Sequence, residues 1–260
     1  MERTVNLWTP FEHTPCLGSG AIAGISICSP DQTEGPYPSF GNEAQHGPHV
    51  VARSVDALAS HLHIDKGALK TVRQVHGKAV LCLRRGDNRD TRSVEADAIV
   101  SDNPHDVLGI KVADCCAILM VDVDRRVVAA CHSGWRGTAL GIAVATIEAM
   151  EKVYGVQRNH VRAWLSPCAS GLRYRVGDDV AKLFPRSSVP LTDGGWLYDN
   201  AAEIRLQLRE AGVERVTVDG RCTIDDSRFH SYRREGAQAG RTLAFIKLAK
   251  DGEPTGTELV

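Results

Sequence analysis

Three short segments of the chain each place a side chain that can ligate a metal beside small residues and an apolar run. They lie at residues 74–77, 113–116 and 131–137 and read Gln-Val-His-Gly, Ala-Asp-Cys-Cys and Cys-His-Ser-Gly-Trp-Arg-Gly. The ends of strands present functional groups on a rigid scaffold. A Cys115 thiolate with the imidazoles of His76 and His132 would form a three-ligand set whose fourth position stays open, as in catalytic zinc sites.

The spacing of these residues leaves more than one interpretation open. The candidate ligands lie far apart in the sequence and match no short-range zinc pattern. Cys115 could instead be the nucleophile of a cysteine hydrolase with His132 as its base, because a neighbouring imidazolium favours the thiolate. A third interpretation is purely structural, with a buried cysteine and two hydrogen-bonded histidines. Residue types and spacing alone do not separate the three.

Arginines near these segments predict the binding of an anion. Residues 133–138 lead into a predicted helix whose free backbone N–H groups would favour an anion, and Arg136 could add a bidentate contact. The alternative is a tight turn in which Thr138 only caps the helix. Arg233 and Arg241 lie beside Ser, Tyr and Gly near the C-terminus. That composition builds anion pockets, although a solvated surface is the other interpretation.

The elements that must position these residues are short strands followed by a helix. Apolar runs at 107–112, 117–121 and 127–130 have strand length, and because they lack a polar face they predict strands covered on both sides. Helical spacing of apolar residues predicts a helix over 138–154 that stops at Gly155. The rest of the pattern predicts a loop with short strands over 17–50, a helix over 50–59, a strand over 79–83, an exposed loop over 84–92, a strand over 161–165, helices over 176–184 and 200–211, and strands over 215–218 and 243–248.

The composition is that of an ordinary globular protein. Of the 260 residues, 43% are hydrophobic and 24% are charged, which excludes a long disordered or fibrous chain. A chain of this length buries roughly 75% of its unfolded surface and needs no cross-links to hold a core. The sequence has neither an internal repeat nor a linker of distinct composition. We therefore expect one α/β domain over 1–250, with a mixed sheet flanked by helices, and a disordered tail over 251–260.

The charge balance and the cysteines exclude several other classes of protein. Lys and Arg total 31 against 32 Asp and Glu, a formal net charge of -1, whereas nucleic-acid binding needs a basic footprint. Residues 1–15 lack the apolar core of a secretory signal, and no stretch reaches the ~20 apolar residues of a membrane span. The eight cysteines lack the dense spacing of a disulfide scaffold. We therefore expect a soluble cytoplasmic protein with reduced cysteines and with neither a nucleic-acid nor a membrane partner.

Taken together and in order, the motifs resemble those of one family. The chain is similar to the laccase-domain, YfiH-like family, which is named for multicopper polyphenol oxidases and was later described as zinc purine nucleoside phosphorylases. The matching segments are 74–77, 95–100, 113–115, 132–137, 166–168, 229–236 and 240–241. Each motif alone is unspecific, whereas all of them in this order are specific, and the resemblance covers residues 20–249.

The resemblance implies a fold, a metal and an activity. The implied fold is an α/β sandwich with a mixed sheet. The implied reactions are phosphorolysis of adenosine, inosine and methylthioadenosine and hydrolytic deamination of adenosine, so that the partners are purine nucleosides and phosphate. The zinc ligands of the family fall on His76, Cys115 and His132.

The resemblance also implies roles for the residues around the zinc ligands. Zinc in a three-ligand site lowers the pKa of water toward 7, which suits deamination. Either the zinc or Arg136 could hold phosphate. Asp114, beside Cys115, becomes a candidate for proton transfer or for orienting a ligand, and Arg233 and Arg241 become candidates for anchoring the substrate. Cys115 and His132 would then act in catalysis as well as in metal binding.

The chain departs from the family pattern close to these motifs. The family usually has Thr, Pro, Glu and Asn at four positions where this chain has Val112, Ala117, Arg175 and Ile204. The three metal ligands are retained while these surroundings have changed. The departures therefore bear on the choice of substrate more than on the metal site.

Other functions stay open beside the phosphorylase. The family's older name suggests a copper-dependent polyphenol oxidase, but one thiolate and two imidazoles can ligate a single copper and not a multicopper cluster. Relatives have been linked to editing of peptidoglycan precursors, which is the substrate class of the cysteine-hydrolase alternative. The last alternative function is that of a non-catalytic protein that binds zinc or a nucleoside. Cys116 and Cys131 adjoin two ligands, and we expect both to point away into the core because neighbouring strand residues face opposite sides.

Overall fold

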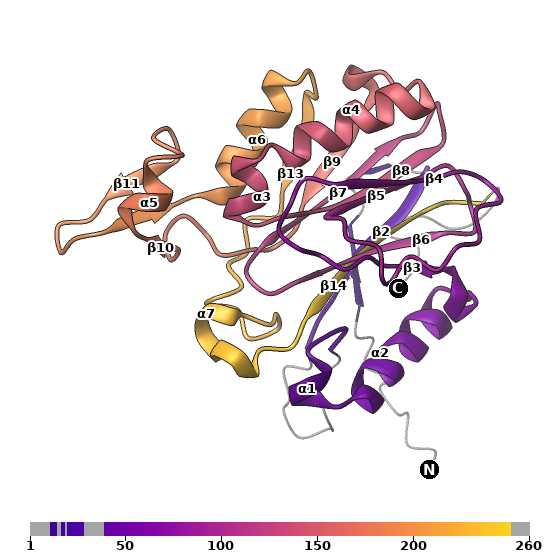
Figure 1. Cartoon of the computed structure of the whole chain (residues 1–260), viewed down its shortest axis with the longest axis horizontal. Coiled ribbons are helices and arrows are strands. Elements are labelled where there is room, and N and C mark those ends of the chain that lie inside the picture. Colours follow the sequence, from indigo (N-terminus) through magenta and orange to yellow (C-terminus); the bar gives the residue numbers. More distant parts are fainter. Residues whose placement is uncertain (1–10, 15–16, 19, 29–38, 251–260) are drawn as a thin grey trace, which may run out of the picture.

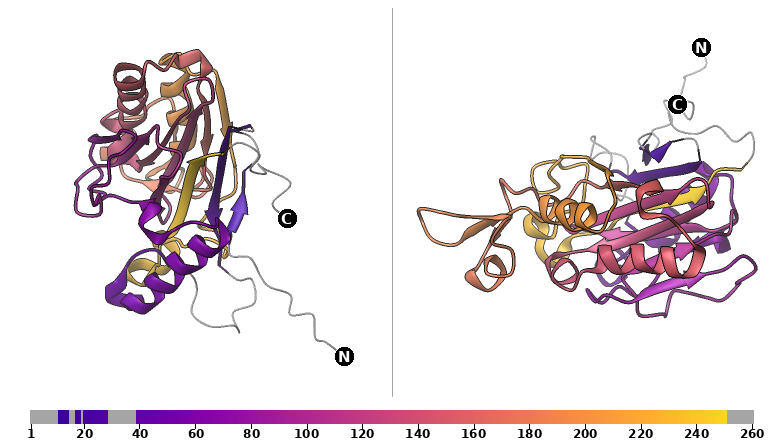
Figure 2. Two further views of the ribbon diagram at one scale, coloured as in Figure 1. Left: turned by 90° about the vertical axis from the view of Figure 1, so that its right-hand side faces the viewer. Right: turned by 90° about the horizontal axis from the view of Figure 1, so that it is seen from above.

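Two β-sheets face each other in this chain, and helices cover their outer faces (Figure 1, Figure 2). The computed structural model describes residues 11–14, 17–18, 20–28 and 39–250. The predicted α/β sandwich class is confirmed. Within these ranges the strands form two large sheets and one small sheet, whereas the sequence pattern alone led us to expect a single mixed sheet.

The first large sheet has five strands and mixes parallel with antiparallel pairs. Its order is β1 (Phe11–His13), β2 (Ala21–Ser26), β14 (Thr242–Leu248), β6 (Val107–Val112) and β3 (Leu69–Lys70). β14 lies at the centre, antiparallel to both β2 and β6. In this register Leu243 lies opposite Lys111, so the residue that enters β14, Arg241, comes close to the end of β6.

The second large sheet has six strands and is also mixed. Its order is β13 (Arg215–Val218), β9 (Arg162–Leu165), β7 (Cys116–Asp122), β8 (Val127–Ser133), β5 (Ala98–Ser101) and β4 (Val80–Leu83). β7 and β8 form an antiparallel hairpin at its centre, in which Ala117 lies opposite His132. Because the hairpin is antiparallel, the start of β7 and the end of β8 lie at the same edge of the sheet.

Alternating side chains of the central strands fill two separate cores. In β7, Leu119 and Val121 contribute to the core between the two sheets, whereas Ile118 and Met120 contribute to the core under the helices. Both faces of these strands are therefore covered, which explains why their sequences show no polar face. The same alternation puts Cys116 and Cys131 in the helix-side core, as the strand argument predicted.

Helices cover the outer face of each large sheet. α4 (Ile142–Tyr154) and α6 (Asn200–Glu210) pack on the second sheet, and α2 (Pro48–His61) packs on the first sheet. The shorter helices in the described part of the chain lie at the ends of the sandwich or beside it, namely α1 (Glu43–His46), α3 (Trp135–Ala139), α5 (Asp178–Ala181) and α7 (Tyr232–Glu235). Single 3₁₀ turns occur at Lys66–Ala68, Arg158–His160 and Gly236–Gln238.

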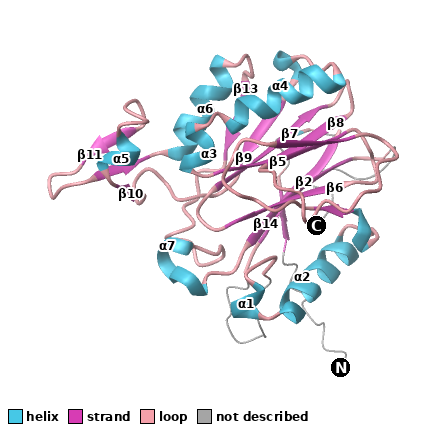
Figure 3. Cartoon of the chain, in the orientation of Figure 1, coloured by secondary structure: helices cyan, strands magenta, loops and turns pink. Residues whose placement is uncertain are grey.

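A small three-stranded sheet projects from one end of the sandwich (Figure 1, Figure 3). It consists of β10 (Arg175–Val176), β12 (Trp196–Tyr198) and β11 (Ser188–Pro190), with α5 beside it. Its own core is small and includes Phe184 stacked on Tyr198, with ring centroids 4.6 Å apart. Trp135 of α3 and Tyr174 pack against this core, so the projection is joined to the sandwich close to the 131–137 motif.

Most predicted elements are confirmed within one or two residues, and the main errors in the prediction concern helices. The predicted helix over 138–154 is two helices, because Gly141 adopts a left-handed conformation (φ 74°) between α3 and α4. Its predicted stop at Gly155 is confirmed (φ 69°). The predicted helix over 176–184 is reduced to the single turn of α5, since the chain around it forms the small sheet. β5 and the small sheet were not predicted.

No helix in the described part of the chain is both long enough and apolar enough to span a bilayer. Residues 251–260 lie outside the described residues, so the predicted tail stays a prediction, as do the domain limits of 1–250. Residues 19 and 29–38 of the predicted loop region over 17–50 also fall outside them, and its described parts contain β2, α1 and the start of α2.

Candidate metal centre and its cavity

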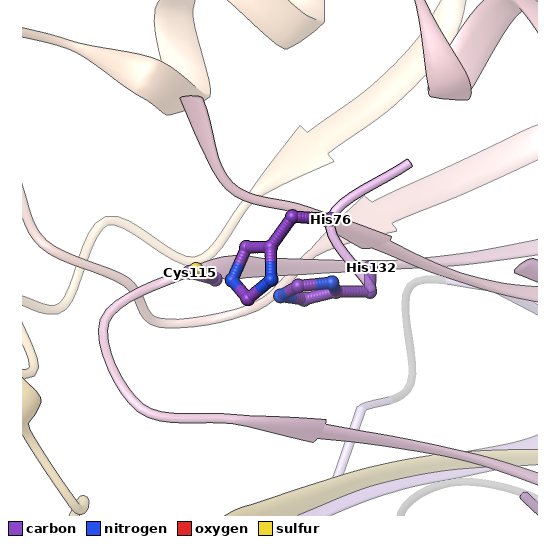
Figure 4. A group of neighbouring side chains, drawn as sticks. All are labelled: His76, Cys115 and His132. Carbon is purple, nitrogen blue, oxygen red and sulfur yellow. The ribbon is translucent and has the colours of Figure 1, made fainter. Parts of the chain in front are cut away.

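The folded chain brings the three candidate ligands together (Figure 4). His76 comes from the loop between β3 and β4, Cys115 from the β6–β7 connection, and His132 from the end of β8. One donor atom of each lies within 4.8 Å of the others. The rings of His76 and His132 meet edge to face, with centroids 4.7 Å apart. The β7–β8 hairpin accounts for this proximity, because it places Cys115 and His132 at one edge of the sheet.

A buried carboxylate, Asp97, positions two of the three ligands. Its Oδ1 accepts hydrogen bonds from His132 Nδ1 at 2.8 Å and from the backbone N–H of His76 at 2.9 Å. Its Oδ2 accepts from the backbone N–H groups of Gly77 at 2.7 Å and Val75 at 3.2 Å. The bond to Nδ1 leaves Nε2 of His132 free to face Cys115 and His76.

The four hydrogen bonds to Asp97 also lower its pKa and stabilise the unfavourable backbone conformation of His76. Burial by itself would raise the pKa of Asp97, but the hydrogen bonds from His132 and Gly77 outweigh it and hold the pKa below its usual range. His76 has a left-handed backbone (φ 58°), which a non-glycine residue adopts at a cost. Hydrogen bonds on both sides of His76 offset that cost, so Asp97 keeps the loop in the conformation that presents the ligand.

Electrostatics favour a thiolate at Cys115 and a proton on His132. Burial opposes both charges, yet the imidazoles of His132 and His76 lower the pKa of Cys115 to about 6. Burial likewise opposes the charge on His132, but the Cys115 thiolate and Asp97 raise its pKa to about 9. In the metal-free protein the two residues therefore form a thiolate–imidazolium pair at neutral pH.

The donor set and the space around it fit a zinc ion. One sulfur and two nitrogens are ligands that zinc prefers, and three protein ligands leave the fourth position open. Gly134 starts α3 directly beside the cluster, where an added Cβ would lie 2.7 Å from Cys115 Sγ and 3.5 Å from His76 Cδ2. A side chain at Gly134 would therefore displace the ligands, so the glycine is required by this close approach.

All the candidate metal-ligating, catalytic and substrate-binding residues line one cavity of about 490 Å³. They are His76, Asp114, Cys115, His132, Arg136, Arg233 and Arg241. Sequence reasoning missed Gln74, Lys111, Trp135, Tyr174, Asn200 and Tyr232, which line the same cavity. It also gave Asp97 no role, although the 95–100 segment was among the matching motifs. A carboxylate directly before a buried strand was the available signal.

The arginines of the cavity differ in how they are held. The guanidinium of Arg136 lies over the Trp135 ring at 4.3 Å, and that of Arg233 lies over the Tyr174 ring at 4.7 Å. Arg241 instead donates from Nη1 to the carbonyls of its own turn, at 2.7 and 2.8 Å. Two aromatic–arginine pairs and one separate arginine therefore face the cavity.

Asp114 connects the ligand loop to α7. Its Oδ1 accepts from Thr223 Oγ1 at 2.7 Å, and its Oδ2 accepts from the backbone N–H of Arg233 at 2.6 Å. Asp114, which immediately precedes the candidate ligand Cys115, has a left-handed backbone (φ 78°), as does His76. These bonds hold the loop that carries Cys115, while Asp114 remains a carboxylate in the cavity wall.

The departures from the family pattern fall in different environments. Arg175 is exposed and pairs with Asp193 on the projecting sheet. Ile204 is fully buried in the helix-side core. One helical turn earlier on the same face, Asn200 lines the cavity and donates from Nδ2 to Ser133 O at 2.8 Å. An amide is therefore present on this face of α6, one turn away from the expected position.

Known proteins resemble the chain in sequence and in fold. The family model for multi-copper polyphenol oxidoreductase laccase matches residues 30–249. A purine nucleoside phosphorylase of Corynebacterium glutamicum is 33% identical over 226 residues, which cover 84% of this chain and 91% of that protein. The purine nucleoside phosphorylase YfiH of Escherichia coli is 32% identical and covers 86% of this chain and 94% of that protein.

A solved structure extends the likeness to three dimensions. The crystal structure of YlmD from Geobacillus stearothermophilus superimposes with a TM-score of 0.82 at 25% identity and covers 91% of this chain and 94% of that chain. The sequence match spans most of the chain and includes all three segments that form the metal cluster. The chain belongs to the multi-copper polyphenol oxidoreductase laccase family, the YfiH-like family that its motifs resemble.

Proposed function

We propose that the chain is a zinc-dependent purine nucleoside phosphorylase that also deaminates adenosine. The observation that carries the proposal is the cluster of His76, Cys115 and His132 in the wall of a cavity of about 490 Å³. A cavity of this size is typical for a small organic ligand. Relatives named purine nucleoside phosphorylase, between 31% and 35% identical, support the phosphorylase half of the proposal.

His76, Cys115 and His132 would hold the metal, which the thiolate form of Cys115 favours. When bound, zinc would supply Lewis-acid chemistry that makes water more acidic at neutral pH. A single copper ion also suits one thiolate and two imidazoles. The other cluster of metal-competent groups in the described residues, Asp122, Asp124 and His160, offers two carboxylates and one imidazole. This chemistry supports one metal ion at the cavity and not the copper cluster of a polyphenol oxidase.

The cavity residues suit the bond changes of phosphorolysis. A phosphate oxygen forms a bond to C1′ of the ribose while the C1′–N9 bond breaks, and the electron pair of that bond leaves with the base, which then takes up a proton. The ribose acquires oxocarbenium character in the transition state. The rings of Trp135 and Tyr174 offer the base an apolar surface, and the guanidinium groups over them favour the negative charge that develops on the base.

Deamination makes different demands on the same cavity. Water adds to C6 of adenine, ammonia leaves with a proton taken from the water, and inosine is formed. Among the described residues that line the cavity, Asp114 is the one carboxylate, so it is the candidate for carrying this proton. Both oxygens of Asp114 accept hydrogen bonds, which fix the orientation of the carboxylate in the cavity wall.

The cysteine-hydrolase alternative has one observation in its favour. The thiolate–imidazolium pair of Cys115 and His132 is also how a nucleophilic cysteine is activated. His76 has no role in that mechanism, whereas the metal interpretation uses all three clustered side chains. The cluster therefore supports the metal enzyme over an acyl-transferring cysteine and the peptidoglycan-type amide substrate that it would cleave.

Product analysis of metal-quantified protein tests the proposal. Purified protein is incubated with adenosine, inosine and methylthioadenosine, with and without phosphate. We expect a free base that requires phosphate, inosine from adenosine without phosphate, and loss of both products in Cys115→Ala together with loss of zinc. Activity that survives in Cys115→Ala contradicts the metal mechanism. One zinc per chain without any product contradicts the choice of substrate and favours a nucleoside-binding or hydrolase function.

A further inference from the structure

Two cationic side chains that belong to neither arginine–aromatic pair lie next to each other in the cavity wall. Lys111 comes from the end of β6 and Arg241 immediately precedes β14, and both line the cavity of the metal cluster. They flank the same glycine, because a Cβ added at Gly41 would lie 2.9 Å from Arg241 Cγ and 3.7 Å from Lys111 Cδ. The pairing of β6 with β14 keeps the two residues together.

The backbone on either side of this pair is firmly held. The amide of Gln74 accepts from Lys111 N–H at 2.9 Å and donates to Lys111 O at 2.8 Å, which ties β6 to the loop that carries His76. The backbone N–H of Arg241 donates to Ser39 Oγ at 3.0 Å. The two cations therefore have fixed attachment points relative to the metal ligands.

Neither cation has an acidic partner among the described residues. Half of the described arginines form ion pairs, as in the contacts of Arg89 with Asp87 and of Arg92 with Asp90. No such ion pair involves Lys111 or Arg241 in the described ranges, although both side chains are half-buried. Burial lowers the pKa of Lys111, Glu43 opposes this from a distance, and the nearby Arg241 adds to the lowering.

Two adjacent half-buried cations that form no ion pair in the described ranges repel each other until an anion binds between them. Arg136 and Arg233 are more exposed and are already held over aromatic rings. Charge–charge attraction is stronger where water is partly excluded, so an anion gains more at Lys111 and Arg241 than at the exposed arginines. Inorganic phosphate, which carries up to two negative charges near neutral pH, matches two adjacent cations.

We propose that Lys111 and Arg241 form the phosphate subsite of the cavity, where inorganic phosphate is bound as the co-substrate. This assignment rests on the proposed phosphorylase function and moves phosphate recognition away from Arg136. The arginine–aromatic pairs at Trp135 and Tyr174 would then bind the purine base, and the ribose would lie between the base and the phosphate.

Calorimetric titration with inorganic phosphate in the absence of nucleoside tests the subsite directly. Lys111→Met keeps the apolar stem of the side chain, and Lys111→Arg restores the charge. Because a hydrogen bond from a charged group contributes strongly to the binding of an anion, we expect Lys111→Met to weaken phosphate binding about 10-fold or more. We expect Lys111→Arg to recover most of the lost affinity. Lys70→Met is the matched control, because Lys70 lines a neighbouring cavity beside α2 and not the cavity of the metal cluster.

Steady-state kinetics separates the subsite from the proposed function. We expect Lys111→Met to raise KM for phosphate by a similar factor while KM for the nucleoside stays near its wild-type value. Phosphorolysis with an unchanged KM for phosphate, or wild-type protein that does not bind phosphate, overturns the subsite. Phosphate binding that depends on Lys111 in a protein that cleaves no nucleoside supports the subsite and contradicts the phosphorylase activity instead.

Discussion

Replacing Asp97 by asparagine should uncouple the metal ligands from the fold that positions them. Asp97 is fully buried, and each of its two oxygens accepts two hydrogen bonds. Asparagine has the same shape but turns one acceptor oxygen into an NH₂ donor. If the NH₂ faces Gly77 and Val75, two backbone N–H groups face another donor. If it faces His132, the imidazole can take the tautomer whose Nδ1 accepts, and only the N–H of His76 faces a donor.

The size of the effect follows from this count. A buried donor without an acceptor costs about 1–3 kcal/mol, so one or two of them predict that Asp97→Asn lowers the free energy of unfolding by roughly 1–6 kcal/mol. Loss of the carboxylate that orients a ligating histidine lowers metal affinity by about 10–100-fold. Both effects are expected together, because one carboxylate holds the His76 loop and the His132 ring.

Two measurements on the same variant separate stability from metal binding. Urea unfolding of metal-free protein gives the free energy of unfolding, and competition with a chromophoric chelator gives the zinc affinity of the folded protein. Asp90→Asn is the control, since Asp90 pairs with Arg92 at the surface and should change neither value by much. Wild-type zinc affinity in Asp97→Asn would refute the reasoning, because Asp97 would then only brace the loop.

The remaining predictions concern the thiolate, the glycine and an acid-sensitive pair. In chelator-treated protein Cys115 should be alkylated rapidly at pH 7, because its pKa is about 6, whereas in zinc-loaded protein it should be alkylated slowly. Mapping the labelled peptide checks this prediction, and equal alkylation rates would favour a free catalytic thiolate. Buried Cys131, with a pKa of about 12, should stay unlabelled in both. Gly134→Ala should weaken zinc binding about tenfold or more, measured by chelator competition, because its Cβ would meet Cys115 Sγ; unchanged affinity would show that the loop adjusts. Arg228 holds the pKa of Asp226 below its usual range against the effect of burial, so the pair stabilises the protein above pH ~4 and is lost as the pH falls through the folded pKa. Asp226→Asn should therefore flatten the loss of unfolding free energy between about pH 5 and 2, and an unchanged slope would contradict this.

The strands of the sandwich were predictable because their signal is local. Runs such as 107–112 and 127–130 are apolar along their whole length, and the structure forms strands there. What the runs do not encode is the partner of each strand. The division into two sheets depends on the pairing of β14 with β6 and β2, residues more than a hundred positions apart in the sequence. The break at Gly141 and the single-turn α5 also depend on packing that no local pattern reports.

The candidate ligands were predictable from residue type, and their surroundings were not. A cysteine and two histidines beside strand ends are recognisable in the sequence, and the family resemblance selected His76, Cys115 and His132 from the other cysteines and histidines. Arg136, Arg233 and Arg241 were also recognisable as cavity residues. Their differences in exposure and in aromatic contacts became visible only in the folded chain.

By itself the sequence determined the α/β class, the approximate strands and the residue types that can do chemistry, since each depends on composition or on short-range periodicity. Only the tertiary structure decided that Asp97 spans the His76 loop and the His132 ring, that Gly134 leaves space for the Cys115 thiolate, and that Lys111 meets Arg241 in the cavity wall. These relations join segments far apart in the chain, and a hydrogen bond or a desolvated charge depends on distances that exist only once the strands have paired.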